Sequence, residues 1–169
     1  HYAPAFEKGM AEQLVEIEAI VDQSGPPTFE NTIVAMEKSG QLLNRVATVF
    51  YSLASAHTND SLELVRSEMA PKLSAHSDQI LLNSKLFERI KTLYDQKTSL
   101  GLDAEAVRLV EETYKDFIRA GANLSADDKE RLKAINAELA IQQTTFSQNV
   151  LKEVNDLAVV VDSREELAG

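Results

Sequence analysis

The side chains best suited to chemistry in this sequence are its three histidines, His1, His57 and His76. None of them begins an HExxH sequence, in which two histidines one helical turn apart hold zinc beside a catalytic glutamate. None follows a glutamate at the Glu-x-x-His spacing of a di-iron helical bundle. We therefore expect His57 to lie against the terminal carbonyls of a helix and His76 to be packed among apolar neighbours. No metal ligand is predicted within the chain.

The other common catalytic groups are missing or badly placed. The chain contains no cysteine, which excludes thiol catalysis, disulfides and thiolate metal sites. No serine lies in a G-x-S-x-G turn, and the glycines form neither a G-x-G-x-x-G nor a Walker A loop. Adjacent acids diverge on a helix and are expected to be caps or solvated surface; these pairs are Glu111-Glu112, Asp127-Asp128 and Glu165-Glu166. The residues therefore predict no catalytic residue and no cofactor in this chain.

Charge and hydropathy limit the partners that the chain can have. It carries 27 acidic and 17 basic residues, for a formal net charge of −10. Such a surface repels phosphates, so nucleic acid and anionic membranes are poor partners. No apolar run approaches the roughly 20 residues that a membrane-spanning helix needs. Together with the absence of cysteine, these features favour a cytoplasmic location.

Apolar residues recur at steps of three and four through most of the chain, which is the spacing of one helix face. The segment 28–57 keeps this spacing without a slip, so it is expected to form one long helix. Pro71 should kink or break the helix that contains it. Helix starts are expected at Thr28, Asn83, Asp103 and Ser125. Another is expected in the cap cluster 58–61, where Asp60 and Glu63 have the spacing of a capping box. The last helix is also long, and its inward stripe is predicted to be Leu132, Ile135, Leu139, Gln142, Phe146, Val150 and Leu157. The predicted fold class is all-α, a bundle of five or six helices, two of them long.

The end of the chain differs from the rest. Val159–Val161 predicts a short strand, and Ser163 with Glu166 has the spacing of a capping box that opens another helix. We therefore expect a non-catalytic helical domain over residues 1–157. Residues 158–169 would be the truncated start of a further segment, which makes the chain a fragment of a longer protein.

Four stretches of the sequence, taken together, point to a known family. They are HYAPAFEKGM, PPTFENTIVAMEKSGQLLNRVATVFYSLASAHTND, LGLDAEAVRLVEETYKDFIRAGANLSADDKERLKAINAELA and TTFSQNVL. In this order they resemble the N-terminal part of zinc oligopeptidases of the thimet oligopeptidase family. Within that family they resemble the bacterial peptidyl-dipeptidases of the Dcp type most, and the oligopeptidase A type next.

This resemblance implies a function that the residue pattern alone does not. Members of the family are largely helical enzymes whose two lobes flank a deep channel that admits short peptides. The Dcp-type members remove dipeptides from free C-termini. One zinc ion is held by an HExxH helix and a further glutamate, and the HExxH glutamate activates the water. These residues belong to the C-terminal catalytic lobe, beyond Gly169, so none of them can be assigned to this chain.

By the same resemblance, this chain would form a wall of the substrate channel, with the catalytic lobe of the same protein and short peptides as its partners. The residues Tyr51, His57 and Asn59 are candidates for facing the channel, although they could instead simply cap and pack. An apolar patch is expected where the catalytic lobe docks. The alternative function is a stand-alone acidic helical bundle that binds another protein and has no enzymatic activity.

Overall fold

The structure is a computed structural model and describes residues 2–157 and 163–164. Most of these residues lie in helices. Six α-helices of 13 to 31 residues are present there, which confirms the all-α fold class. They are α1 (Tyr2–Val21), α3 (Gln41–Ala56), α4 (Asp60–Leu81), α5 (Ser84–Gln96), α6 (Ala104–Arg119) and α7 (Ala126–Asp156). A π-helical turn, η1 (Phe29–Val34), and the short α2 (Ala35–Glu37) precede α3. The predicted strand at Val159–Val161 lies outside the described residues.

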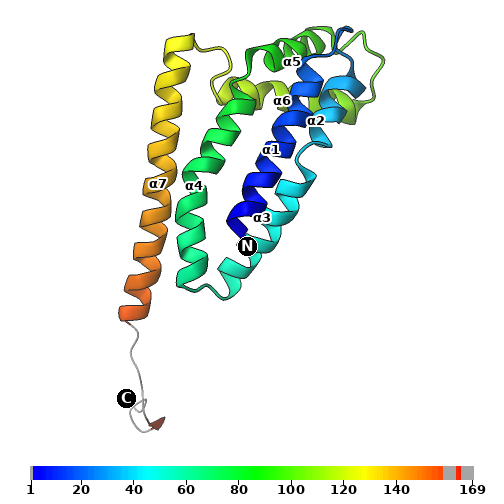
Figure 1. Ribbon diagram of the computed structural model, residues 1–169. Coiled ribbons are helices and arrows are strands. Elements are labelled where there is room, and N and C mark those ends of the chain that lie inside the picture. Colours follow the sequence, from blue (N-terminus) through cyan, green and yellow to red (C-terminus); the bar gives the residue numbers. More distant parts are fainter. Residues whose placement is uncertain (1, 158–162, 165–169) are drawn as a thin grey trace.

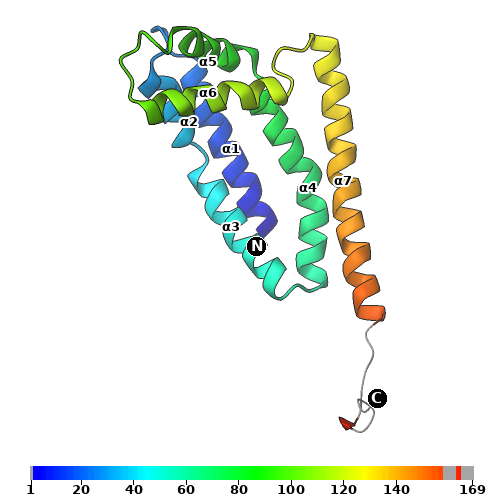
Figure 2. The ribbon, with the colours of Figure 1, turned by 180° about the vertical axis from the view of Figure 1, so that it is seen from behind.

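Four of the helices form a layer, and two others close one end of it. In Figure 1, α1, α3, α4 and α7 run roughly side by side, with α4 between α1 and α7. The helices α5 and α6 pack on each other and lie across one end of this layer, as Figure 2 shows from behind. The helix α7 therefore stands at the edge of the molecule and packs mainly on α4.

The predicted single helix over residues 28–57 is wrong. It is interrupted at Gly40, whose φ of 71° is left-handed and ends the helical path before α3 begins. The Gly40 N–H donates to the Glu16 carboxylate at 2.7 Å, and the Gln13 side chain fills the space that a Cβ would need. Both partners lie on α1. The break therefore depends on a neighbouring helix and not on a local interruption of the apolar pattern.

The starts of the helices agree better with prediction. The side chains of Thr28, Asn83, Asp103 and Ser125 each accept a hydrogen bond from the backbone N–H three residues later, as N-caps do. At the start of α4, however, the cap is Asn59 and not Asp60, because the Asn59 side chain accepts from the Leu62 N–H. The helix α4 also continues through Pro71, so of the predicted kink or break, the break does not occur.

Two apolar clusters hold the layer and its covering helices together. The larger cluster joins α1, η1, α5 and α6, and its buried members are Ile17, Ile20, Ile33, Leu86, Phe87, Ile90, Leu93, Val110, Phe117 and Ala122. The smaller cluster joins α1, α3 and α4 through Phe6, Phe50 and Met69. Neither cluster includes a residue of α7.

The predicted inward stripe of α7 is also wrong. No residue of α7 is buried, and Ile135, Leu139 and Phe146 are 60%, 50% and 69% exposed. The helix instead places smaller or polar side chains against α4. The spacing identified the apolar face of α7 correctly, but most of that face is exposed and not packed inside the bundle.

Candidate functional site

The three residues predicted to face a channel lie at the end of α3 and in the turn that follows it. The helix α3 ends at Ala56, and the backbone N–H of His57 donates to the carbonyl of Leu53 at 2.9 Å. The His57 side chain is exposed. Asn59 is exposed as well, but its side-chain oxygen is engaged in capping α4. Asn59 therefore caps α4, and His57 is the C-cap residue of α3 through its backbone. That either residue faces a channel stays a prediction.

Tyr51 differs from them because it borders a hollow between α3, α4 and α7. This Tyr51 hollow has a volume of about 290 Å³ and is lined by Tyr51, Arg66, Ala70, Leu73, Ala140, Gln143, Thr144 and Ser147. The ring packs edge-on against Phe50 and Phe6, with centroid distances of 5.1 and 6.3 Å. Burial raises the pKa of the Tyr51 hydroxyl, and the positive charge of Arg66 offsets part of that rise. The phenol therefore stays protonated at neutral pH and can donate a hydrogen bond.

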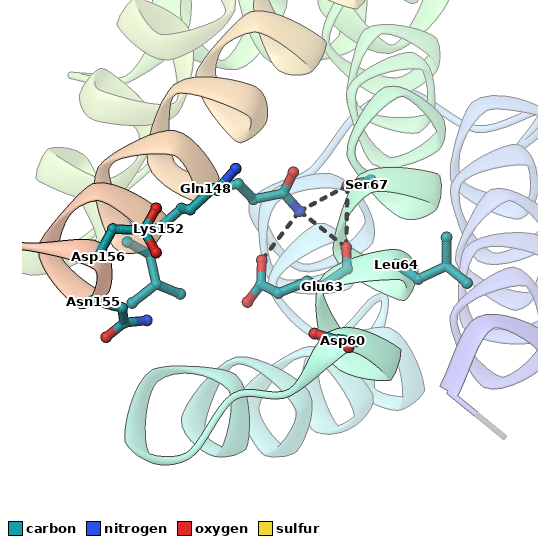
Figure 3. A pocket seen from close by; sticks show the side chains of 9 residues that line it. Asp60, Glu63, Leu64, Ser67, Gln148, Lys152, Asn155 and Asp156 are labelled. Atoms are coloured by element: carbon teal, nitrogen blue, oxygen red, sulfur yellow. Dashed lines mark hydrogen bonds between the residues drawn. The ribbon is translucent and has the colours of Figure 1, made fainter.

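A second hollow lies on the same α4–α7 seam, nearer the C-terminal end of α7 (Figure 3). This Glu63 hollow has a volume of about 550 Å³; it is lined by Asp60, Glu63, Leu64, Ser67, Gln148, Leu151, Lys152, Asn155 and Asp156. Three carboxylates stand here beside two leucines and one lysine. Such a lining could accept hydrogen bonds from a basic group that also has an apolar part.

Gln148 holds the two sides of the Glu63 hollow together. Its amide nitrogen lies 2.9 Å from Ser67 Oγ, 3.2 Å from the Glu63 carbonyl and 3.1 Å from Glu63 Oε2 (Figure 3). The other carboxylate oxygen of Glu63 accepts from the Thr58 hydroxyl and lies 3.6 Å from the Arg66 guanidinium. Glu63 is therefore bound from both helices and from the α3–α4 turn, so its orientation is set by the fold.

The residues that line these hollows on α7 were missed in the sequence. The missed signal is a second stripe of small and polar residues at helical spacing, made by Ala137, Ala140, Thr144 and Gln148. This stripe lies on the opposite side of α7 from the apolar stripe. An apolar stripe draws attention first because burial usually follows hydrophobicity. Here the small and polar stripe faces the neighbouring helix.

His57 and His76, the two histidines that the structure describes, do not form a metal site. His76 is 6% exposed, and its Nε2 lies 2.7 Å from Gln13 Oε1, which confirms that it is packed within the bundle. Burial lowers the pKa of His76 below its usual value, so the ring is neutral at pH 7. Within residues 2–157 and 163–164, no group of three His, Cys, Asp or Glu side chains could hold a metal ion. The described residues therefore do not fit the zinc ion that the family resemblance implies.

Comparison with known proteins confirms the resemblance seen in the sequence. The chain is 44% identical to a dipeptidyl carboxypeptidase of Salmonella typhimurium and 41% identical to one of Escherichia coli, in each case over all 169 residues. It is 24% identical to oligopeptidase A of Escherichia coli over the same length. In each comparison the chain spans 25% of the relative's length. No protein-family model matches the chain.

None of the described helices combines the length and the hydropathy that crossing a bilayer would require.

Proposed function

Because this chain is related over its whole length to dipeptidyl carboxypeptidases and to oligopeptidase A, we propose that it is the N-terminal domain of a zinc peptidyl-dipeptidase. The complete protein would remove C-terminal dipeptides from short peptides. The observation that carries this proposal is the 44% identity, which extends over all 169 residues without covering more than a quarter of the relative. The proposed location is the cytoplasm.

In this proposal the chain does no chemistry itself. The zinc ion and its HExxH ligands would belong to a catalytic lobe outside these 169 residues, and the ion would supply an activated water there. The helices described here would shape access to the channel. They suit this role because α1, α3 and α4 share a packed core that holds their exposed faces in fixed positions.

Within this domain, Tyr51 is the strongest of the three candidates for contact with the peptide. Its hydroxyl is protonated and its ring is held by Phe50 and Phe6, so it can offer a hydrogen bond from a fixed position. His57 and Asn59 lie farther along, in the α3–α4 turn, and would border the channel entrance. Contact with substrate away from the zinc would affect binding more than the chemical step.

The first test is to read the source gene beyond the codon for Gly169 and to produce the encoded polypeptide. We expect an HExxH sequence on an apolar helix, one zinc ion per chain, and release of C-terminal dipeptides. The 169-residue chain alone should take up no stoichiometric zinc and cleave no peptide. Turnover by the pure, metal-free 169-residue chain would overturn the proposal.

The channel role has its own test in the longer polypeptide. Tyr51→Ala should raise KM several-fold while kcat stays nearly unchanged. Val49→Ala is the matched control, because Val49 is 48% exposed on the same helix, about 160° around it from Tyr51. Equal KM values for both variants and the parent would argue against contact between Tyr51 and the peptide.

The second candidate function is a stand-alone acidic bundle that binds another protein. The exposed apolar residues of α7 favour it, since large exposed apolar surfaces commonly mark interaction sites. A stop codon directly after Gly169 would support this reading and remove the peptidase proposal.

A further inference from the structure

The helix α7 presents an unpartnered apolar face to solvent, which we call the α7 flank. It consists of Ile135, Leu139, Phe146, Val150, Val154 and Leu157, which are between 45% and 72% exposed. Ile135 and Leu157 are 22 positions apart in the sequence, so the flank is about 33 Å long. No other helix described here carries as many exposed large apolar residues.

The flank cannot turn inward by rotation of α7, because polar contacts fix the helix at three levels. Lys129 Nζ lies 3.1 Å from the Leu82 carbonyl and 3.0 Å from Ser84 Oγ at the N-terminal end. Asn136 donates to Asp78 at 2.7 Å in the next part of the helix, and Gln148 binds Glu63 and Ser67 farther along. Rotation would break all of these contacts, including those to the buried Asp78.

The spacing of the flank suits a long, nearly straight partner. Ile135, Leu139, Phe146, Val150 and Leu157 are separated by four, seven, four and seven residues. Each pair of steps makes 11 residues, close to three full turns, so these five side chains stay within about 60° of one line along α7. A second helix lying along that line could contact all five.

The surface beside the flank is hollowed at Leu139. This hollow has a volume of about 390 Å³, and Leu139 of the flank lines it together with Ser74 of α4 and Ala140 of α7. Small side chains such as Ser74 and Ala140 let another helix approach closely. A helix that lies on the flank could therefore also contact this hollow.

We propose that the occupant of the α7 flank is a helix of the same polypeptide, from the part outside these 169 residues. This inference rests on the proposed function. The chain spans 25% of the relatives' length, so the remaining three quarters could supply such a helix. A second copy of this chain fits less well, because each copy carries a net charge of −10 and the two would repel each other. Docking through α7 would hold this domain against the lobe and so fix the width of the channel between them.

The absence of cysteine from the chain allows a direct test by thiol labelling. Val150→Cys places a thiol on the flank, where the native side chain is 45% exposed. Ile141→Cys is the matched control, since Ile141 is 50% exposed and about 180° around α7 from Val150. Both substitutions are at exposed positions and should leave the fold intact. The label is located by peptide mass spectrometry, so thiols elsewhere in the longer polypeptide do not interfere.

In the 169-residue chain, both thiols should react at similar rates. In the longer polypeptide, Val150→Cys should react at least tenfold more slowly, while Ile141→Cys should be unchanged. Equal rates for the two variants in the longer polypeptide would overturn the inference. Protection of Val150→Cys in the 169-residue chain alone, rising with protein concentration, would also overturn it in favour of a second copy.

Peptidase activity and zinc content are measured separately on the unlabelled longer polypeptide. Activity without protection of Val150→Cys would leave the proposed function standing and remove the docking surface. Protection without activity would support the docking surface and remove the peptidase assignment. The two proposals can therefore fail independently.

Discussion

The helices α6 and α7 are both amphipathic, but their apolar faces meet opposite surroundings. The apolar residues Val110 and Phe117 of α6 are at most 2% exposed and lie in the larger cluster. On α7, Phe146 is 69% exposed and no residue is buried. Amphipathic spacing therefore identifies which face of a helix is apolar. Whether this chain or another one covers that face depends on the rest of the fold.

The largest expected effect comes from comparing one phenylalanine on each of these helices. Phe117→Ala should lower the free energy of unfolding by about 3–5 kcal/mol, because it removes a large buried ring and leaves a cavity. Phe146→Ala should change it by less than about 0.5 kcal/mol, because that ring already contacts water. Urea denaturation of the 169-residue chain measures both. A large decrease in the free energy of unfolding for Phe146→Ala would mean that Phe146 is covered in the 169-residue chain. The cover would be a second copy of the chain or the chain's own residues.

The next effect concerns how closely the helices of the layer approach one another. A Cβ added at Gly9 of α1 would lie 2.8 Å from the Cα of Leu43 on α3, so a backbone must move. We expect Gly9→Ala to cost about 3 kcal/mol, near the upper end for overpacking. Gly25→Ala is the control, since nothing lies within 4 Å of its added Cβ. Thermal unfolding that gave the same midpoint for both variants would show that α1 and α3 are packed more loosely.

A smaller effect is expected on the α4–α7 seam, where polar contacts replace apolar ones. Asn136→Ala should cost about 1–2 kcal/mol, because the carboxylate of the buried Asp78 loses its 2.7 Å donor. Gln142→Ala, at an exposed position of the same helix, should cost almost nothing. Hydrogen exchange offers a second measurement, in which Asn136→Ala should speed exchange within α7 more than within α6.

These differences show which parts of the structure could be predicted from sequence. The N-caps at Thr28, Asn83, Asp103 and Ser125 were found because a cap is a local contact between a side chain and a backbone group three residues away. The break at Gly40 was missed because Glu16 and Gln13 of α1 stabilise it, more than 20 residues earlier in the chain. Contacts between residues close in the sequence could be predicted, and contacts between different helices could not.

The candidate site was predicted less completely than the fold. Tyr51 borders a hollow, and its contact with a channel stays a prediction. No pattern in the sequence indicates that Gln148 binds Glu63 from the opposite helix. That contact requires α7 to place its small and polar stripe on α4. The outward apolar stripe of α7 has a physical reason if another part of the polypeptide covers it. The sequence of these 169 residues does not show which part that would be.

The smallest expected effect is a pH dependence that arises at the α1–α4 contact and not on α7. Burial lowers the pKa of His76 in the folded chain, whereas in the unfolded chain the ring has its ordinary pKa of 6.5. Above that pH neither state binds the proton, so the folded state carries no penalty. As the pH falls below 6.5 the unfolded state takes up the proton first, and the free energy of unfolding decreases until the pH reaches the lowered folded pKa.

His76→Gln should remove this decrease, and His57→Gln, at an exposed position, should leave it in place. Urea midpoints measured from pH 7.5 down to about pH 5 test this expectation. The same slope in His76→Gln as in the parent chain would show that His76 is not the source of the pH dependence.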